Sequence, residues 1–300
     1  MRYVSPLRYP GGKAGLTRFL TDAIDLNDLR GCAYYEPYAG GAGAALGLLR
    51  NNVVSKVFIN DADKRVYAFW ISVLQSSELF VKRVRAIPLT IDEWHQQHAI
   101  CRQPDAYGQF DVGFAAFFMN RCNRSGVLTG SGPIGGFSQS GKWQLDARFN
   151  RDALSERILA LGRLRQDISV TCFDAIEFLK KSLPRGPKRR GVFVYLDPPY
   201  VSNGQRLYLN AYKDRDHSKL ARYLDKQQTL SWLMSYDDNV LIRSLYSRHR
   251  LDLMPIRYSL QEKRSAQELI IAPPYLTVPQ AYRLRKPENL VQPTDGRMAL

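Results

Sequence analysis

Cysteine is scarce in this chain of 300 residues. The four cysteines, Cys32, Cys101, Cys122 and Cys172, stand far apart and form no C-x-x-C pair. Neither a zinc site built from cysteine pairs nor a disulfide framework is therefore indicated. We expect reduced thiols in a cytoplasmic protein.

Long apolar runs are also missing. A membrane span needs about 20 consecutive apolar residues, and stretches such as 42–49 and 191–196 are far shorter. Charged residues and prolines within the first ten positions argue against a signal peptide. The sequence predicts an unexported protein that does not enter a membrane.

Acidic residues are outnumbered: 43 Lys and Arg stand against 28 Asp and Glu, a net charge of +15. Such an excess favours a polyanionic partner, either nucleic acid or an anionic membrane surface. Hydrophobic residues make up 45% of the chain, enough for a packed core. The length is typical of about two domains.

Glycine, proline and charge divide the chain, since it has neither heptads nor repeats. The pattern predicts helices and strands in alternation, with helices over 14–26, 44–50, 151–164 and 175–181 and strands over 32–35, 53–60, 168–172 and 192–196. Two later strands, 251–258 and 268–271, are expected to pair antiparallel. This order favours a doubly wound α/β sheet that binds its ligand at the carboxyl ends of strands. Between the strand over 53–60 and the helix over 151–164, the apolar residues of 67–149 have helical spacing, followed by a glycine-rich segment over 120–143.

A glycine-rich loop, E-P-Y-A-G-G-A-G over 36–43, follows a predicted strand and opens a helix. Glycine lets the backbone approach a nucleotide-like ligand closely. Asp61 ends the next strand 18 residues after Gly43, where an acid could bind ribose hydroxyls. A tight turn with a capping acid, or a dinucleotide enzyme, would give a similar pattern. Glu36 would repel pyrophosphate, so it favours a ligand with an ammonium or sulfonium group.

The most specific motif is D-P-P-Y, formed by Asp197, Pro198, Pro199 and Tyr200 after an apolar strand. A carboxylate, two rigid prolines without amide donors and an aromatic ring suit a flat molecule that bears an amino group. The alternative is a strand end broken by prolines. A similar A-P-P-Y over 272–275 has no carboxylate, and we interpret it as structural.

Over roughly residues 5–275 the chain resembles the Dam-like, alpha-class DNA adenine N6-methyltransferases. The resemblance lies in the order of the motifs at 7–13, 35–43, 60–61, 173–174 and 197–200. It implies a doubly wound, mixed, Rossmann-like sheet with an antiparallel C-terminal strand and an inserted, mainly helical DNA-recognition domain. The implied division is a catalytic domain over 1–66 and 150–280, a target-recognition domain over 67–149 and a basic tail over 281–300.

The same resemblance implies S-adenosylmethionine as cofactor. The residues expected to bind it are Tyr9, Gly12, Lys13, Glu36, Pro37, Tyr38, Gly40, Gly41, Gly43, Asp61, Asp174 and Asp197.

Methyl transfer to adenine N6 needs hydrogen-bond acceptors, because the lone pair of the amino group is delocalised into the ring. Asp197 and the Pro198 carbonyl can accept from that group, and Tyr200 can stack on a base turned out of duplex DNA. The residues expected to bind DNA are Arg8, Asn120, Arg121, Asn123 and Arg124.

The implied partner is double-stranded DNA, with a possible cognate restriction endonuclease. We expect a monomer or weak dimer, associated with the nucleoid through DNA.

The sequence does not exclude other methyl acceptors or other classes of protein. Cytosine N4 or RNA would suit the same chemistry, and a nicotinamide-dependent oxidoreductase or a non-catalytic DNA-binding protein are the rival classes. The basic run 180–190 is either a solvated loop or a phosphate contact. His95 and His98 are expected on a helix surface, and 235–237 either line the cleft or cap a helix.

Overall fold

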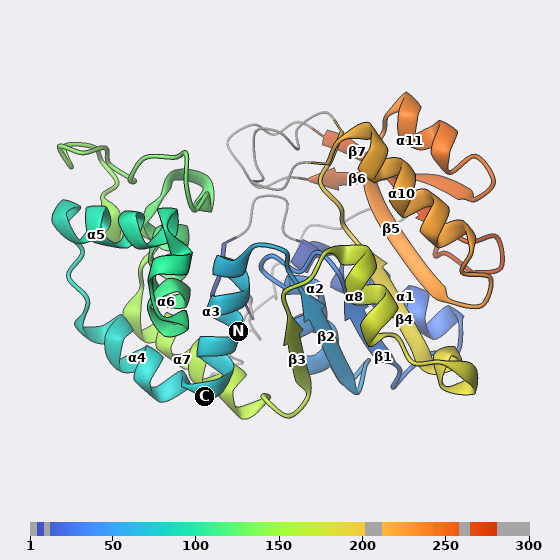
Figure 1. Cartoon of the computed structure of the whole chain (residues 1–300), viewed down its shortest axis with the longest axis horizontal. Coiled ribbons are helices and arrows are strands. Elements are labelled where there is room, and N and C mark those ends of the chain that lie inside the picture. The colour runs from blue at the N-terminus through green and yellow to red at the C-terminus, as the bar shows by residue number, and fades with distance from the viewer. Residues whose placement is uncertain (1–4, 9–12, 202–211, 258–264, 281–300) are drawn as a thin grey trace, which may run out of the picture.

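The computed structural model describes residues 5–8, 13–201, 212–257 and 265–280 (Figure 1). Tyr9 and Gly12, two of the expected cofactor residues, lie outside the described residues, as does the basic tail over 281–300.

A mixed sheet of seven strands forms the centre, in the order β3-β2-β1-β4-β5-β7-β6. The strands are β1 (Ala33–Glu36), β2 (Lys56–Asn60), β3 (Ile168–Thr171), β4 (Val192–Leu196), β5 (Ser231–Asp237), β6 (Arg250–Arg257) and β7 (Ser265–Ala272). Strands β1 to β5 pair parallel, whereas β7 runs antiparallel to both β5 and β6. The expected doubly wound sheet with an antiparallel C-terminal strand pair is confirmed.

Two apolar clusters lie on opposite faces of this sheet, and β4 shows why. All five of its residues are buried. Phe193 and Tyr195 belong to one cluster, whereas Val194 and Leu196 belong to the other. Successive side chains of a strand point to opposite faces, so a central strand covered on both sides reads as a continuous apolar run.

Helices cover both faces. One side carries a short 3-10 helix, η1 (Lys13–Leu16), with α1 (Thr17–Leu26) and α2 (Gly43–Arg50). The other side carries α8 (Ala175–Ser182), α10 (Asp214–Asp225) and α11 (Val240–Leu245). The segment 235–237 ends β5 and therefore does not cap a helix.

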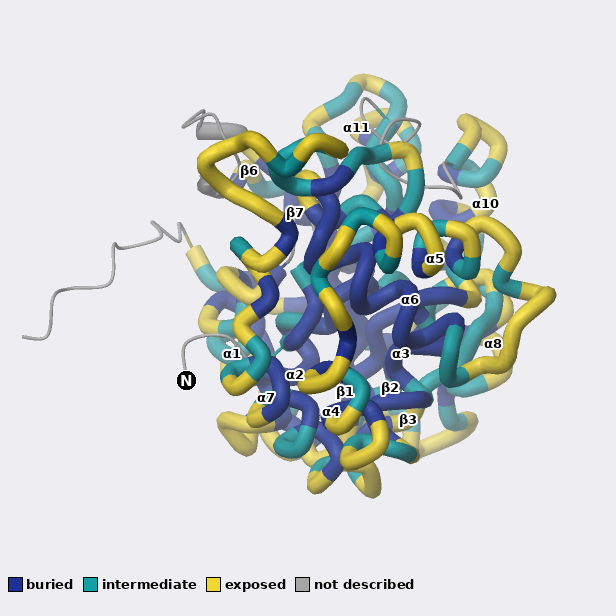
Figure 2. Tube along the Cα trace, turned by 90° about the vertical axis from the view of Figure 1, so that its left-hand side faces the viewer, coloured by how far each residue is buried: buried dark blue, intermediate teal, exposed yellow. Residues whose placement is uncertain are grey.

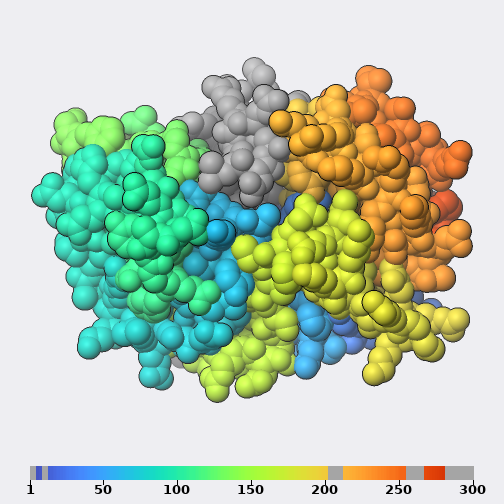
Figure 3. Space-filling view, viewed as in Figure 1, coloured from blue at the N-terminus to red at the C-terminus, as the bar shows by residue number. Residues whose placement is uncertain are grey.

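A helical segment enters between β2 and β3. It consists of α3 (Lys64–Gln75), α4 (Ser77–Ala86), α5 (Ile91–Arg102), α6 (Gln109–Cys122) and α7 (Arg151–Arg163), with short turns η2 (Pro104–Ala106), η3 (Arg124–Gly126) and η4 (Leu145–Arg148). Figure 3 shows it as the cyan and green flank of the molecule, opposite the orange flank of α10 and α11.

Helix α6 is buried at the centre of the helical segment, beside α3 (Figure 2). The two helices touch at Gly113, where a Cβ would lie only 2.4 Å from the Ala68 carbonyl oxygen. One continuous apolar cluster joins this segment to the sheet. The expected boundary at residue 66 falls inside α3, and the division into domains stays a prediction. No helix among the described residues is long and apolar enough to cross a membrane.

Candidate active site

Acidic side chains meet at the carboxyl edge of the parallel strands. Glu36 ends β1, Asp61 follows β2 and Asp197 follows β4. Because β1 pairs in parallel with both β2 and β4, these three strand ends lie side by side. The structure thus brings together the glycine loop and the D-P-P-Y motif, which lie far apart in the sequence.

The glycine loop takes a backbone that favours glycine. Gly40 has φ +46°, in the left-handed region. A Cβ at Gly43 would lie 3.0 Å from the Ala14 Cβ, so glycine lets the loop pack against η1. The Trp70 indole from α3 donates to the Gly40 carbonyl at 3.0 Å. Helix, strand and insert together hold the loop in place.

Asp61 ties this loop to the end of β2. Its Oδ2 accepts from the Gly40 amide and its Oδ1 from the Asp63 amide, both at 2.9 Å. Burial, and then the charge of Asp63, raise the pKa of Asp61 to about 7 against these hydrogen bonds. A carboxylate oxygen can accept more than one hydrogen bond, so Asp61 can hold the loop and bind a ligand hydroxyl together.

Glu36 is buried at the end of β1 and accepts from the Ala45 amide in the first turn of α2 at 3.2 Å. Burial is the main cause that raises its pKa to about 8, and the charge of Asp197 adds to it. A carboxyl held in this way ionises readily only when a cation arrives beside it.

Asp197 has one carboxylate oxygen engaged and one available. Its Oδ1 accepts from the Ser235 hydroxyl at 3.0 Å, and lies 3.4 Å from the Tyr200 hydroxyl and 3.2 Å from the Lys13 ammonium. Among the described residues, no hydrogen bond or ion pair of Asp197 is made through Oδ2. The side chain is 19% exposed. The motif therefore offers a hydrogen-bond acceptor to a molecule from outside.

Glu268 joins this cluster, and sequence reasoning missed it. Its Oε1 lies 2.7 Å from the Lys13 ammonium and accepts from the Tyr200 hydroxyl at 2.5 Å. The only signal in the sequence was a glutamate next to the apolar run 269–272 of a predicted strand. Its partners, however, come from the other end of the chain and from the D-P-P-Y motif.

Other expected cofactor residues line the same edge with structural partners of their own. The Pro37 carbonyl accepts from Asn60 at 3.0 Å, and the Tyr38 hydroxyl lies 2.7 Å from that of Tyr212. Asp174 caps α8 by accepting from the Ile176 amide at 2.9 Å. A cofactor contact of Asp174, like that of Gly41, stays a prediction, and so does a catalytic role of Pro198 and Pro199.

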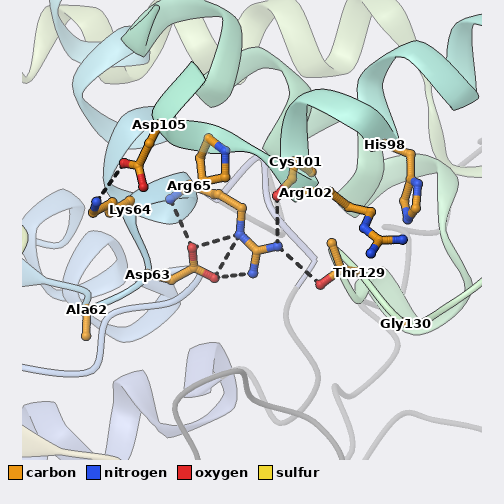
Figure 4. A pocket seen from close by; sticks show the side chains of 11 residues that line it. Ala62, Asp63, Lys64, Arg65, His98, Cys101, Arg102, Asp105, Thr129 and Gly130 are labelled. Atoms are coloured by element: carbon orange, nitrogen blue, oxygen red, sulfur yellow. Dashed lines mark hydrogen bonds and ion pairs between the residues drawn. The ribbon is translucent and has the colours of Figure 1, made fainter. Parts of the chain in front are cut away.

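A pocket of about 650 Å³ lies beside this edge, between the start of α3 and the end of α5 (Figure 4). Two of its cations are already paired. Arg65 lies 2.5 Å from Asp63, and Lys64 lies 2.7 Å from Asp105. These pairs reduce the charge that the pocket offers an anion, so the cluster around Asp197 is the stronger candidate for the active site.

Two of the five expected DNA-binding residues use their side-chain amide groups in hydrogen bonds within the protein. The Asn120 amide group binds the Arg8 main chain, accepting from its N–H at 2.7 Å and donating to its carbonyl at 2.6 Å. Asn123 accepts from the Trp94 indole at 2.7 Å and donates to the Val127 carbonyl at 2.7 Å. Both asparagines are fully buried. Their polar atoms hold the loop after α6, and DNA binding by either asparagine stays a prediction.

The arginines of the same region behave differently from each other. Arg124 is exposed. Arg121 is only 6% exposed, and its Nε has no hydrogen-bond partner among the described residues. Burial, followed by the charges of Arg157, Arg8 and Arg148, lowers the pKa of Arg121 to about 9. Four guanidinium groups thus gather where α6, η4, α7 and the N-terminal segment meet.

Three further motifs lie away from this site. The basic run 180–190 leads directly into β4, at the amino edge of the sheet and opposite Asp197, which favours a solvated loop. His95 and His98 lie on α5 against aromatic rings, Phe137 and Trp94 respectively. No cluster of potential metal ligands is found among the described residues. Tyr275 of A-P-P-Y donates to the Leu230 carbonyl at 2.9 Å, a structural contact.

Comparisons with known proteins place the chain in a family. Residues 9–264 match the D12 class N6 adenine-specific DNA methyltransferases. No curated protein sequence matches the chain significantly.

Solved structures are similar to the chain only at low identity. A Streptococcus pyogenes protein described as a conserved hypothetical protein is 8% identical with a TM-score of 0.36, over 83% of this chain and 89% of its own. A proposed class I S-adenosylmethionine-dependent methyltransferase from Listeria monocytogenes is 8% identical with a TM-score of 0.38, over 91% and 66%. A proposed methyltransferase complexed with SAH is 11% identical with a TM-score of 0.25, over 65% and 55%. These identities and TM-scores are too low to support a conclusion about function.

Proposed function

The chain belongs to the D12 class N6 adenine-specific DNA methyltransferase family, and we propose that Asp197 is the residue that binds the acceptor amino group. Membership means that the chain transfers a methyl group from S-adenosylmethionine to adenine N6 in DNA. The family does not say which side chains of this sequence act in the reaction. The proposal assigns them.

The observation that carries the assignment is the asymmetry of the Asp197 carboxylate. Ser235, Tyr200 and Lys13 all approach Oδ1, which fixes the plane of the group. Oδ2 can then accept a hydrogen bond from an adenine amino group without losing any of these contacts. An acceptor fixed in advance localises the nitrogen lone pair at no cost in reorganisation during the reaction.

The charges around the glycine loop suit the cofactor. S-adenosylmethionine supplies an electrophilic methyl group on a sulfonium, and its methionine part carries an ammonium. Glu36, Asp61 and Asp197 end or follow three neighbouring strands, and Glu36 is buried with the charge of Asp197 acting on it. Lys13 pairs with Asp197 and Glu268, whereas the cation that acts on Asp61 is Arg65. We propose that Glu36 faces the cationic methionine end and that Asp61 accepts from the ribose hydroxyls, as a carboxyl after the second strand does in related folds.

Double-stranded DNA is the proposed form of the substrate. An adenine inside a duplex must be turned out of the stack before its amino group can reach Asp197. Tyr200 supports this step, because its ring lies beside Asp197 and 6.2 Å from the Tyr236 ring. We propose that the flipped base stacks on Tyr200.

The DNA contacts divide into two kinds. We propose that the arginine group of Arg8, Arg121, Arg148 and Arg157 binds a backbone phosphate, because Arg121 is a buried cation without an ion pair among the described residues and needs an anion. The exposed Arg124 stays our candidate for reading a base edge. A cognate endonuclease, a monomer or weak dimer and a place in the cytoplasm on nucleoid DNA are proposed from the family resemblance alone.

The test is methyl transfer by the purified chain from isotope-labelled S-adenosylmethionine to duplex DNA, with the modified base identified by mass spectrometry. We expect N6-methyladenine. Asp197→Asn should lower turnover about 10²- to 10³-fold and leave cofactor affinity within a few-fold. Asp238→Asn is the matched control, because Asp238 pairs with Arg243 in a half-exposed position. Methylated cytosine would overturn the acceptor, and full turnover by Asp197→Asn would overturn the role of Asp197.

A further inference from the structure

Glu268 is a buried carboxylate to which the reaction described so far gives no task. It lies on β7, opposite Asp237 of β5, and its side chain is 1% exposed. Leu269, Ile270 and Ile271, which follow it in the strand, are buried apolar residues. Carboxylates are almost never fully buried unless they are paired. The partners of Glu268 therefore show what the residue does.

Those partners are two residues of the active site. Glu268 Oε1 lies 2.7 Å from the Lys13 ammonium and 2.5 Å from the Tyr200 hydroxyl. The ammonium also donates to the Tyr200 hydroxyl at 2.6 Å and lies 3.2 Å from Asp197 Oδ1. One oxygen of Glu268 thus connects η1 to the D-P-P-Y motif.

We propose that Glu268 is a positioning residue for methyl transfer: it holds the Lys13 ammonium and the Tyr200 hydroxyl, and so keeps Asp197 Oδ2 available to the adenine amino group. The inference rests on the proposed role of Asp197. Two carboxylates share one ammonium, and the shorter of the two ion pairs belongs to Glu268. Without the charge of Glu268, Coulomb attraction would draw Lys13 onto Asp197.

Because Glu268 shares the Lys13 ammonium, the Asp197 carboxylate also stays basic enough to accept a strong hydrogen bond. Burial is the main cause that raises the pKa of Asp197 to about 6, Lys13 and the Ser235 hydroxyl lower it, and Glu268 raises it. Loss of the Glu268 charge should therefore lower the pKa of Asp197. The other titratable groups of the described residues that interact with Asp197 come from the same strands and from the D-P-P-Y motif: Tyr34 and Glu36 of β1, Tyr195 of β4, Tyr236 of β5 and Tyr200.

A second consequence concerns the Tyr200 ring. Its hydroxyl contacts Glu268, Lys13 and Asp197 together, which fixes the position of the outer end of the ring. A ring held at its outer end stays at one position beside a flipped base. A shift of about 1 Å in such a group can cost about 10²-fold in rate.

The experiment is Glu268→Gln, which keeps the shape of the side chain and removes its charge. We expect maximal turnover to fall by about 10- to 100-fold, with the dissociation constant of S-adenosylmethionine within a few-fold of the parent. The acid limb of the turnover–pH profile should move to lower pH by about one unit, the usual size for loss of a neighbouring like charge. A purely structural role for Glu268 would not move that limb. The matched control is Asp25→Asn, which removes a carboxylate on α1 that is paired with Arg30.

The outcomes separate this inference from the proposed function. An inactive parent enzyme overturns the proposed function, whereas an active parent with an unshifted acid limb in Glu268→Gln overturns only the role of Glu268. If that variant does not fold, Tyr200→Phe decides, because it removes the hydroxyl that Glu268 holds and keeps the ring. We expect Tyr200→Phe to lose turnover about 10-fold at unchanged cofactor affinity, and parent-like turnover would overturn the positioning role.

Discussion

The Asp61 carboxylate accepts a hydrogen bond from the Gly40 amide at 2.9 Å, so the end of β2 holds the glycine loop that follows β1. A second bond, from the Asp63 amide to the other oxygen, fixes the plane of the carboxylate. The residue proposed to bind ribose is therefore also the residue that shapes the loop around the cofactor. A substitution at Asp61 should act on both at once.

We predict that Asp61→Asn weakens S-adenosylmethionine binding about 10- to 100-fold, because it removes a charge-assisted hydrogen bond of about 1.5–3 kcal/mol. Asparagine would also place its NH2 group, a hydrogen-bond donor, against the N–H of Gly40 or of Asp63, which is itself a donor. Isothermal titration calorimetry measures the change. Asp105→Asn, which removes an exposed carboxylate paired with Lys64, should bind the cofactor like the parent. Unchanged affinity in Asp61→Asn would remove Asp61 from the cofactor site.

Glu36 should make the cofactor-free protein less stable as pH rises. Its pKa is raised from 4.5 to about 8 in the folded chain, so between these values the folded state binds more protons than the unfolded state. Stability then falls as pH increases through that window, by at most about 1.4 kcal/mol per pH unit for this group.

In thermal melts from pH 5 to pH 9, the melting temperature of Glu36→Gln should fall less steeply with pH than that of the parent, since the amide does not titrate. Glu177→Gln, at a half-exposed carboxylate paired with Lys181, should keep the parent's slope. Equal slopes for Glu36→Gln and the parent would contradict the raised pKa of Glu36.

The sequence predicted the parts of the site that follow a strand. Glu36, Asp61 and Asp197 each stand where an apolar run ends, and parallel strands place their carboxyl ends at one edge of a sheet. Glu268 could not be found in this way, because its partners depend on the register of an antiparallel strand near the end of the chain. The structural role of Asn120 could not be predicted for another reason. A sequence shows a polar side chain but not whether its hydrogen bonds are already used within the protein.

The buried Arg121 side chain should destabilise the folded protein when no DNA is bound. It is a buried cation whose Nε has no hydrogen-bond partner in the described part of the chain, and the charges of three arginines act on it. We predict that Arg121→Met raises the free energy of unfolding by about 1–3 kcal/mol, as replacing buried charges by apolar groups can do, and weakens binding to every duplex alike. Chemical denaturation and binding isotherms at several salt concentrations test both parts. The slope of log affinity against log salt should flatten by about 0.9 if one phosphate contact is lost. Lower stability of Arg121→Met would mean that the guanidinium is satisfied within the protein.

Arg124 should affect specificity rather than overall affinity. Its side chain is exposed on the loop after α6, while its main chain is fixed, with the amide donating to the Gly132 carbonyl at 3.1 Å and the carbonyl accepting from the Ser131 hydroxyl at 3.1 Å. A side chain on a fixed backbone can read a base edge at small entropic cost. We therefore predict that Arg124→Ala narrows the gap between target and scrambled duplexes by about 1–3 kcal/mol, with stability unchanged. Arg102→Ala, at an exposed arginine on α5, is the control for loss of charge alone. Equal losses on both duplexes would show that Arg124 binds phosphate, and base reading would then have to come from another part of the loop.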